Sequence, residues 1–506
     1  MKLATFATLA ATSVLATAAA VWVAVEPAAG AGRATAPPAP PGPGEPAVAP
    51  PAPPPAPPEP TVDRSRFAAG KTLLLEGRLG HAQLPADQAS ETFLFLDVSA
   101  DAGRTAARVP LELAIVLDKS GSMKGRRMAN AMAATRRALE RLRDGDVVSF
   151  ITYDTSAELV VPPTVIDAAS RRRLLATLTA PRPSKDTCIS CGLDAGLRAL
   201  GQRPGMVRRV LLLSDGIATA GMRDLPGFQR LAEDARRLGA SITTVGVDVD
   251  YDERILAALA RDSNGGHYFV ERPDGLPAIF DEEMRTLGRT VASATELVVD
   301  LAPGVSAEHV YDRVTVSSGR QLVVPLGTVA AGERKTALIR LRVPAGAAGA
   351  RPVADVRLRY DDLVDQRPGL SEGALVALAT ADASEPAPLD GVVSARLSAS
   401  ETAATLEQAN ELYRRGRERE ATTLLRARAG AVRVQTAAAR SAPMAGADPD
   451  DADAAAAAFA EQEKVLDRAT RGFAPASPTA ARPPADSKPA KANMRNAQAD
   501  ALTIAR

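Results

Sequence analysis

Several residue types that carry familiar chemistry are scarce in this sequence. Its 506 residues include two cysteines and three histidines, and aromatic residues make up 3% of the chain. Two cysteines cannot build a disulfide-rich scaffold. The histidines, His81, His267 and His309, are scattered along the chain, so no histidine-based catalytic centre is indicated. A net charge of +1 gives no strong field for nucleic acid or anionic lipid, and we therefore expect no nucleic-acid partner.

The motifs of common enzymes are also incomplete. Gly70, Lys71 and Thr72 end like a phosphate-binding loop, but Ser65 stands where that loop requires a glycine. Ser120 and Ser122 do not lie in the Gly-x-Ser-x-Gly turn of a hydrolase nucleophile. No positioned general base is visible beside them. The sequence therefore gives no case for catalysis, and we expect a protein that is not an enzyme.

The amino end predicts export from the cytoplasm. Residues 3–25 contain no charged residue and follow Lys2, as in a secretory signal. The stretch is long enough to span a bilayer, and small residues at 18–20 would suit cleavage. Residues 1–25 are therefore either a cleaved signal peptide or a retained transmembrane anchor, and both place the rest of the chain in the periplasm or cell envelope. Residues 26–60 are rich in proline and predict an extended linker.

The most informative stretch is residues 111–123, LELAIVLDKSGSM. A mostly apolar run with little alternation predicts a strand that is buried on both faces, as in parallel sheets. Asp118, Ser120 and Ser122 follow it and would lie at the carboxyl edge of the sheet, where open α/β sheets bind ligands. Three hard oxygen donors without imidazole or thiolate favour a hard divalent cation, Mg²⁺ before Ca²⁺.

Beyond this stretch, strand and helix patterns alternate as far as residue 289. Buried-strand patterns cover residues 147–153, 207–214 and 241–247, and helical patterns occupy intervening segments. Alternating β and α units of this length are typical of a doubly wound, mainly parallel sheet. We therefore predict a Rossmann-like α/β domain over residues 110–289.

Two further residues complete the pattern of a known family. Thr187 precedes a predicted helix, and Asp215 follows a central buried strand. Together with Asp118, Ser120 and Ser122, they resemble the metal-ion-dependent adhesion site of von Willebrand factor A (VWA) domains. The resemblance implies that the serines and the threonine ligate a cation, that the aspartates bind it directly or through water, and that a carboxylate of a protein partner completes the shell. Mg²⁺ suits this role, with Mn²⁺ or Ca²⁺ as alternatives.

The loop around Thr187 departs from the family pattern. Lys185 and Asp186 stand where the family often has two glycines, and Asp186 would add a negative charge near the metal. Cys188 and Cys191 follow directly. In an exported protein we expect first a disulfide that stiffens the metal loop, then two free small residues, and only then redox chemistry. Zinc is a poor rival because two cysteines with no nearby histidine are too few ligands.

The segments on either side of the α/β domain predict a second, all-β unit. Strand-like runs occur within residues 61–109 and, between Gly and Pro turns, within residues 290–382. We predict that leading and trailing strands form an antiparallel sandwich from which the α/β domain emerges. This arrangement resembles bacterial envelope proteins related to the inter-α-trypsin inhibitor heavy chains, although the leading segment is shorter than the amino-terminal domain of those proteins.

The carboxyl-terminal region predicts a helical segment followed by a tail. Residues 397–430 show the spacing of one tetratricopeptide-like helical hairpin, which as a single copy cannot stack into a solenoid and which we expect to dock on the sandwich. Residues 440–506 are rich in Ala, Pro, Asp and Lys and predict a mostly disordered tail, with a transient helix over residues 453–471.

Three functions fit these features, and we rank them. The first is an exported, adhesion-type protein whose cation coordinates an acidic residue of a protein partner. The alternative is an envelope assembly or scaffold factor in which the metal is structural. A metal-dependent hydrolase comes last, because no general base accompanies a metal-bound water.

Overall fold

The computed structural model describes most of the chain after the proline-rich segment. The described residues are 64–104, 109–183, 186–201, 203, 205–441, 449–474 and 487–505. The predicted signal segment and the linker lie outside them. Within these ranges, no helix combines the length and the apolar character that crossing a membrane requires.

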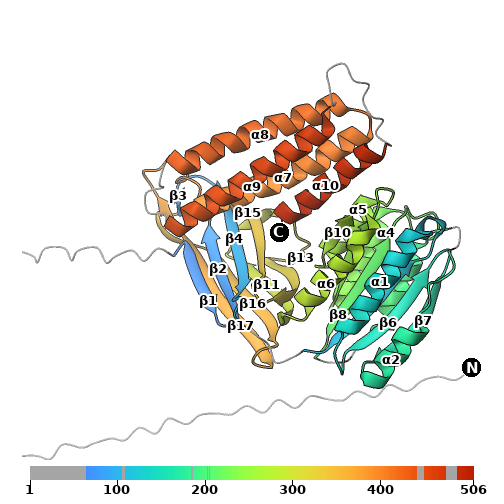
Figure 1. Cartoon of the computed structure of the whole chain (residues 1–506). Helices are drawn as coiled ribbons and strands as arrows, with labels where there is room; N and C mark the ends of the chain where they lie inside the picture. Colours follow the sequence, from blue (N-terminus) through green and yellow to red (C-terminus); the bar gives the residue numbers. More distant parts are fainter. Residues whose placement is uncertain are drawn as a thin grey trace, which may run out of the picture. The chain divides into compact units, whose positions relative to one another are not determined.

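A six-stranded sheet forms the central domain (Figure 1). Its order is β10–β9–β8–β5–β6–β7, and neighbouring strands are parallel except at β7, an antiparallel edge strand. All eight residues of β5 are buried, which explains its largely apolar sequence. The strands are β5 (Leu111–Asp118), β6 (Val147–Tyr153), β7 (Ala157–Val165), β8 (Val207–Ser214), β9 (Ala240–Val247) and β10 (His267–Val270).

Helices cover both faces of this sheet. Alternate residues of β5 enter two separate cores: Leu113 and Leu117 pack on one face, Ala114 and Val116 on the other. The first face is covered by α1 (Arg126–Arg141), α2 (Ala168–Thr177) and α6 (Leu276–Leu287). The second is covered by α3 (Ile189–Ala199), α4 (Leu225–Arg237) and α5 (Glu253–Asp262). The predicted doubly wound, mainly parallel α/β fold is therefore confirmed.

Two mainly antiparallel sheets share one core and form a sandwich beside this domain. Strand β4, which precedes the α/β domain, pairs with β15, which follows it. The α/β domain is therefore inserted between strands of the sandwich. One sheet contains β1 (Arg66–Gly70), β2 (Leu73–Leu79), β4 (Ser90–Ala100), β15 (Arg334–Val343) and β12 (Ser306–Tyr311). The other contains β13 (Val316–Ser318), β14 (Gln321–Ala330), β11 (Thr290–Leu301), β16 (Gly349–Asp362), β17 (Arg367–Thr380) and β3 (Gln83–Pro85).

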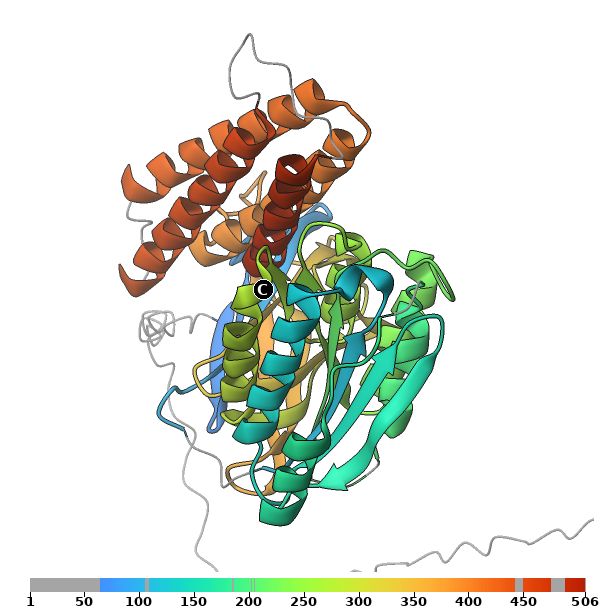
Figure 2. The ribbon, with the colours of Figure 1, turned by 45° about the vertical axis from the view of Figure 1, so that its right-hand side comes forward.

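The carboxyl-terminal region is a helical bundle. The predicted disorder is wrong for residues 449–473 and 488–504, which are helical, and the helix expected over residues 453–471 falls within the first of these segments. The rest of the predicted tail beyond residue 441 lies largely outside the described residues. Helices α7 (Gly391–Arg414) and α8 (Glu418–Ser441) extend beyond the predicted hairpin. Helices α9 (Pro449–Phe473) and α10 (Lys488–Ile504) lie within the predicted tail, and Figure 2 shows the helices of this region gathered in one bundle. The four helices share one core. Alanine is the strongest helix former, so an alanine-rich stretch with a few large apolar residues can fold once a partner covers its apolar face.

Helix α10 connects the bundle to the α/β domain, where it contacts α5 and β10. Lys488 pairs with Asp248 at 3.0 Å, and Lys491 pairs with Asp250 at 2.9 Å. Both aspartates belong to the loop between β9 and α5.

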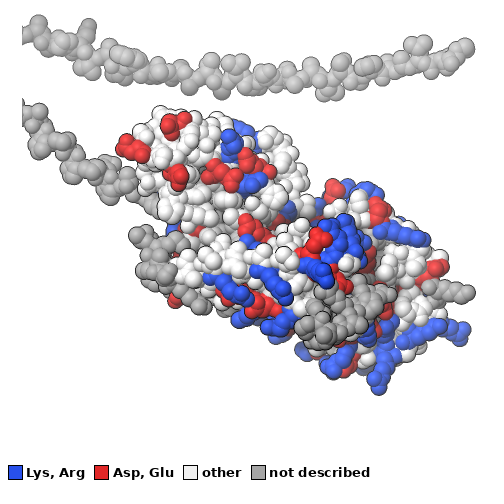
Figure 3. Space-filling view, turned by 90° about the horizontal axis from the view of Figure 1, so that it is seen from above, with Lys and Arg blue, Asp and Glu red and all other residues white. Residues whose placement is uncertain are grey.

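On the face drawn in Figure 3, Lys and Arg side chains are interspersed with Asp and Glu, in keeping with the net charge of +1.

Candidate metal centre

The candidate site begins where β5 ends. Asp118 is the last residue of this strand and is fully buried. Its Oδ1 accepts a hydrogen bond from the Ser120 backbone N–H at 2.7 Å, and its Oδ2 accepts one from Ser214 Oγ at 2.9 Å. The chain then turns through a short 3-10 helix, η1 (Gly121–Met123), before α1. The carboxylate of Asp118 is therefore held in one orientation by two neighbouring strand ends.

Two serines connect this loop to the end of β8. The hydroxyls of Ser120 and Ser122 are 3.0 Å apart, and Ser122 Oγ donates to Asp215 Oδ1 at 2.7 Å. Strands β5 and β8 are adjacent and parallel, with Leu117 opposite Leu213. Because parallel neighbours end at the same edge, residues far apart in sequence meet there.

Thr187 reaches the same edge from the loop before α3. Its backbone N–H donates to Thr219 Oγ1 at 2.8 Å, and its carbonyl accepts from the backbone N–H of Thr219 at 3.0 Å. A Cβ added to Gly216 would lie 3.6 Å from both Thr187 Oγ1 and Ser122 Oγ. The structure thus gathers all five predicted residues, Asp118, Ser120, Ser122, Thr187 and Asp215, around one point.

The electrostatics of this cluster suit a cation. Burial raises the pKa of Asp118 to about 6. The hydrogen bond from the Ser120 N–H stabilises the ionised carboxylate and lowers the pKa, but by less than burial raises it. Burial also raises the pKa of Asp215. Two desolvated carboxylates with three hydroxyls form an all-oxygen donor set, which fits a hard divalent cation such as Mg²⁺. In the described parts of the chain, no three His, Cys, Asp or Glu side chains gather in a way that could hold a metal, so this donor set depends on the hydroxyls.

Sequence reasoning missed two charged residues behind the site. Arg127, in the first turn of α1, donates to Asp215 Oδ2 at 2.8 Å and also pairs with Asp248. Asp248 adopts a left-handed backbone conformation with φ of 61° and follows β9, which ends at the same edge of the sheet. Its position after a parallel strand was the signal that could have revealed it.

Tyr153 and Ser214 were also missed. Tyr153, at the end of β6, places its hydroxyl 3.4 Å from Asp118 Oδ2 and 3.2 Å from the carbonyl oxygen of Leu213. Burial raises the pKa of Tyr153 well above its ordinary value, so the hydroxyl stays protonated and available as a donor. A tyrosine ending one apolar strand and a serine ending another carry no distinctive sequence signal.

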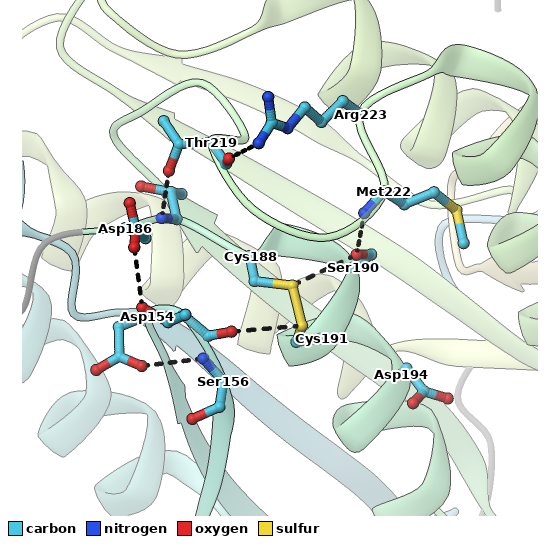
Figure 4. The surroundings of a disulfide bond; sticks show 12 residues. Asp154, Ser156, Asp186, Cys188, Ser190, Cys191, Asp194, Thr219, Met222 and Arg223 are labelled. Carbon is cyan, nitrogen blue, oxygen red and sulfur yellow. Dashed lines mark hydrogen bonds between the residues drawn. A yellow bond between two sulfur atoms is a disulfide. The ribbon is translucent and has the colours of Figure 1, made fainter.

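The loop before Thr187 lies differently from what its sequence suggests. Asp186 is exposed, and its Oδ2 accepts a hydrogen bond from Thr155 Oγ1 at 3.3 Å. Figure 4 shows Asp186 on the side of the loop that faces Asp154. The carboxylate that was expected to add charge near the metal is thus engaged with the neighbouring loop after β6.

Cys188 and Cys191 form a disulfide at the start of α3 (Figure 4). It packs against the loop after Asp215, because a Cβ added to Gly221 would lie 2.3 Å from Cys188 Sγ. Gly221 has a φ of +67°, and Ser190 Oγ accepts from the Met222 N–H at 3.0 Å. The disulfide therefore lies between the two loops that carry Thr187 and Asp215.

The fold and the site together define a class: a doubly wound α/β domain that carries oxygen donors on the loops at the carboxyl edge of its sheet. The family model described as von Willebrand factor type A domain matches residues 112–282. This part of the chain is a VWA domain, as the resemblance predicted.

Curated relatives share this domain and part of its surroundings. The chain is 25% identical over 285 residues to the uncharacterised protein sll0103 of Synechocystis sp., covering 54% of this chain and 67% of that protein. It is 22% identical over 288 residues to the uncharacterised protein YfbK of Escherichia coli K12, covering 55% of this chain and only half of that protein. Mouse inter-alpha-trypsin inhibitor heavy chain H2 is 25% identical over 168 residues, 31% of this chain and 17% of that protein.

A solved structure extends the similarity in fold beyond the VWA domain. The von Willebrand factor type A protein from Catenulispora acidiphila superposes with a TM-score of 0.59 at 18% identity. The match covers 78% of this chain and 98% of that chain. Because the VWA family match ends at residue 282, an overlap of this extent includes further parts of the fold.

Proposed function

We propose that this chain is an exported, adhesion-type protein that binds a protein partner through a divalent cation in its VWA domain. Asp118, Ser120, Ser122, Thr187 and Asp215 would hold the cation. When bound, the cation supplies a coordination position for a carboxylate of the partner. The observation that supports this proposal most strongly is the convergence of five oxygen-bearing side chains from three separate loops. VWA domains commonly mediate protein–protein interaction and adhesion.

The neighbours of the five residues suit a site that is preformed. Ser214 and the Ser120 N–H orient Asp118, while Arg127 and Ser122 orient Asp215. A carboxylate held in this way loses little rotamer freedom when it meets a cation, which favours binding. Mg²⁺ needs few protein ligands and keeps several waters, one of which a partner carboxylate can displace.

Export is supported by two independent features. Residues 3–25 have the length and the uncharged character of a signal peptide or signal anchor. The disulfide between Cys188 and Cys191 supports export, because disulfides persist in oxidising compartments such as the periplasm and are rare in the cytoplasm. Fractionation of cells should find the protein in the envelope or periplasm, and a cytoplasmic location would contradict this part of the proposal.

Capture of envelope proteins on the immobilised full-length protein tests the proposed binding. We expect at least one captured protein to be lost when EDTA replaces Mg²⁺ and lost again with Asp118→Ala. Asp186→Ala is the matched control, because Asp186 is an exposed carboxylate beside Thr187 whose hydrogen bond goes to Thr155. Identical captured proteins under all these conditions would refute metal-dependent binding.

One alternative is favoured by the contacts of α10. Lys488 and Lys491 tie the bundle to the loop that holds Asp248, and under this alternative the VWA domain and the bundle act together as a scaffold with a structural cation. Under this alternative, chelation lowers the melting temperature without changing the captured proteins.

A further inference from the structure

An exposed isoleucine stands next to the candidate metal centre. Ile217 is 58% exposed, although it lies only two residues after Asp215. Two residues of chain place the two Cα atoms within about 7.6 Å of each other. The loop is anchored on both sides of Ile217, since Asp215 is buried before it, Ala218 is buried after it, and Thr219 Oγ1 accepts a hydrogen bond from the Thr187 N–H. Ile217 is therefore presented to solvent by an ordered loop.

Ile217 lines a hollow of about 430 Å³. The hollow is built jointly by the VWA domain and the bundle: Tyr251 and Arg254 belong to the start of α5 and the loop before it, and Lys491 and Met494 belong to α10. Methionine adapts its shape to different apolar groups, so this end of the hollow suits a variable apolar side chain.

Charged side chains surround the hollow, and Arg254 is the most exposed of its cations. The lining includes four cations, Arg254, Arg414, Lys491 and Arg495, and two carboxylates, Asp252 and Glu253. Each of the four cations is paired with a carboxylate of this chain, so an acidic ligand would meet chiefly the exposed Arg254. Glu253 is buried and already paired with both Arg414 and Arg495. Lys491 is paired with Asp250, and the more exposed Arg254 lies 3.6 Å from Asp252.

We infer that this hollow is a second subsite for the partner of the metal centre. This inference rests on the proposed function. The hollow takes a large apolar side chain of the partner, which follows the metal-bound carboxylate in the same acidic segment. The apolar side chain packs against Ile217 inside the hollow. A second carboxylate of the segment faces Arg254, whose side chain is 58% exposed at the rim.

Selection from a phage-displayed library of random dodecapeptides tests this inference. The full-length protein is immobilised with Mg²⁺, and bound phage are eluted with EDTA. We expect the eluted peptides to be enriched in an acidic residue followed, within about four residues, by Leu, Ile, Phe or Met. Because Ile217→Ser removes the aliphatic surface against which that side chain packs, the variant should weaken the affinity for a selected peptide about tenfold.

Leu225→Ser is the matched control, because Leu225 is also an exposed aliphatic residue, at the start of α4, but does not line the hollow. It should leave the peptide affinity unchanged, while Mg²⁺ titration of both variants reports separately on the metal loop. Acidic peptides without an apolar preference, or a peptide affinity indifferent to Ile217→Ser, would overturn the subsite and leave the metal-dependent function intact. If EDTA elutes no enriched peptide at all, the proposed function falls together with the subsite.

Discussion

The VWA domain and the carboxyl-terminal bundle bury very different interiors. In the VWA domain, Leu, Val and Ile of β5, β6, β8 and β9 supply much of the core on each face of the sheet. The bundle core contains many alanines, and buried polar groups accompany them: Ser398 and Thr402 both donate to Gln462 Oε1 at 2.9 Å. The first region is stabilised mainly by burial of large apolar side chains, and the second also relies on side-chain hydrogen bonds.

This difference has a consequence for function. Because large apolar side chains stabilise the VWA core, the domain can keep two buried carboxylates at one edge of its sheet. Desolvated carboxylates at that edge cost stability, and the proposed cation would offset this cost. The bundle has no comparable cluster of raised carboxyl pKa values among its described residues, where Asp500 is the one carboxyl group shifted upward.

Large-to-small substitutions in the two cores should have the largest effect on stability and should test the difference between the two regions. Leu211→Ala in β8 and Leu466→Ala in α9 each remove a fully buried leucine. Both should cost about 2–5 kcal/mol of unfolding free energy. We expect the larger loss at Leu211, because a sheet covered on both faces cannot close the void, whereas helices lined by alanine can shift together. Urea unfolding measures the loss of unfolding free energy in each variant. A larger loss for Leu466→Ala than for Leu211→Ala would contradict this prediction.

Asp118→Asn should stabilise the metal-free protein at pH 7.5. The pKa of Asp118 is raised from 3.8 to about 6, which means that folding favours the protonated carboxyl group. The stability that this protonated group contributes is fully present below pH 3.8 and is lost as the pH rises through 6. Removing the charge should recover roughly 3 kcal/mol at pH 7.5 and much less near pH 4. Mg²⁺ should raise the melting temperature of the wild type but not of the variant. A variant that melts below the metal-free wild type at pH 7.5 would refute this.

Opening the disulfide should have a smaller effect. The bond between Cys188 and Cys191 closes a short loop, which limits its contribution to about 2 kcal/mol. Reduction should loosen Thr187 and weaken Mg²⁺ binding several-fold, while the bundle, which contains no cysteine, keeps its helical signal. Mg²⁺ titration with and without reductant measures the effect, and equal affinities would sink the proposed role of the disulfide.

The smallest effect should come from the ion pairs that join the two regions. Lys488→Ala and Lys491→Ala each remove one pair between α10 and the loop after β9. Exposed pairs contribute about 0.2–1 kcal/mol, so both variants should melt close to the wild type. A loss above 2 kcal/mol for Lys488→Ala alone would show that the chain Lys488–Asp248–Arg127–Asp215 couples the bundle to the metal loop.

The sequence predicted the VWA domain because its signals are local and strong. An apolar strand followed by Asp118, Ser120 and Ser122 fixes a strand end, and Asp215 follows a strand of the same kind. By contrast, Arg127 and Asp248 meet only through tertiary structure, since 121 residues separate them. No spacing rule predicts such a pair.

The bundle could not be predicted for a different reason. Residues 449–473 and 488–504 are rich in alanine and charged residues, which resembles the composition of a disordered tail. Their order depends on Phe459, Leu466, Phe473 and Met494 finding a shared core with α7 and α8. Helical stability of this kind comes from packing against partners rather than from the segment itself.

Calorimetric titration of the full-length protein with Mg²⁺ tests the central claim most directly. Wild type and Asp186→Ala should each bind one ion per VWA domain, whereas Asp118→Ala and Thr187→Ala should lose measurable binding or bind at least tenfold more weakly. Heats of binding that are the same in all four proteins would contradict the assignment of the metal centre to this edge of the sheet.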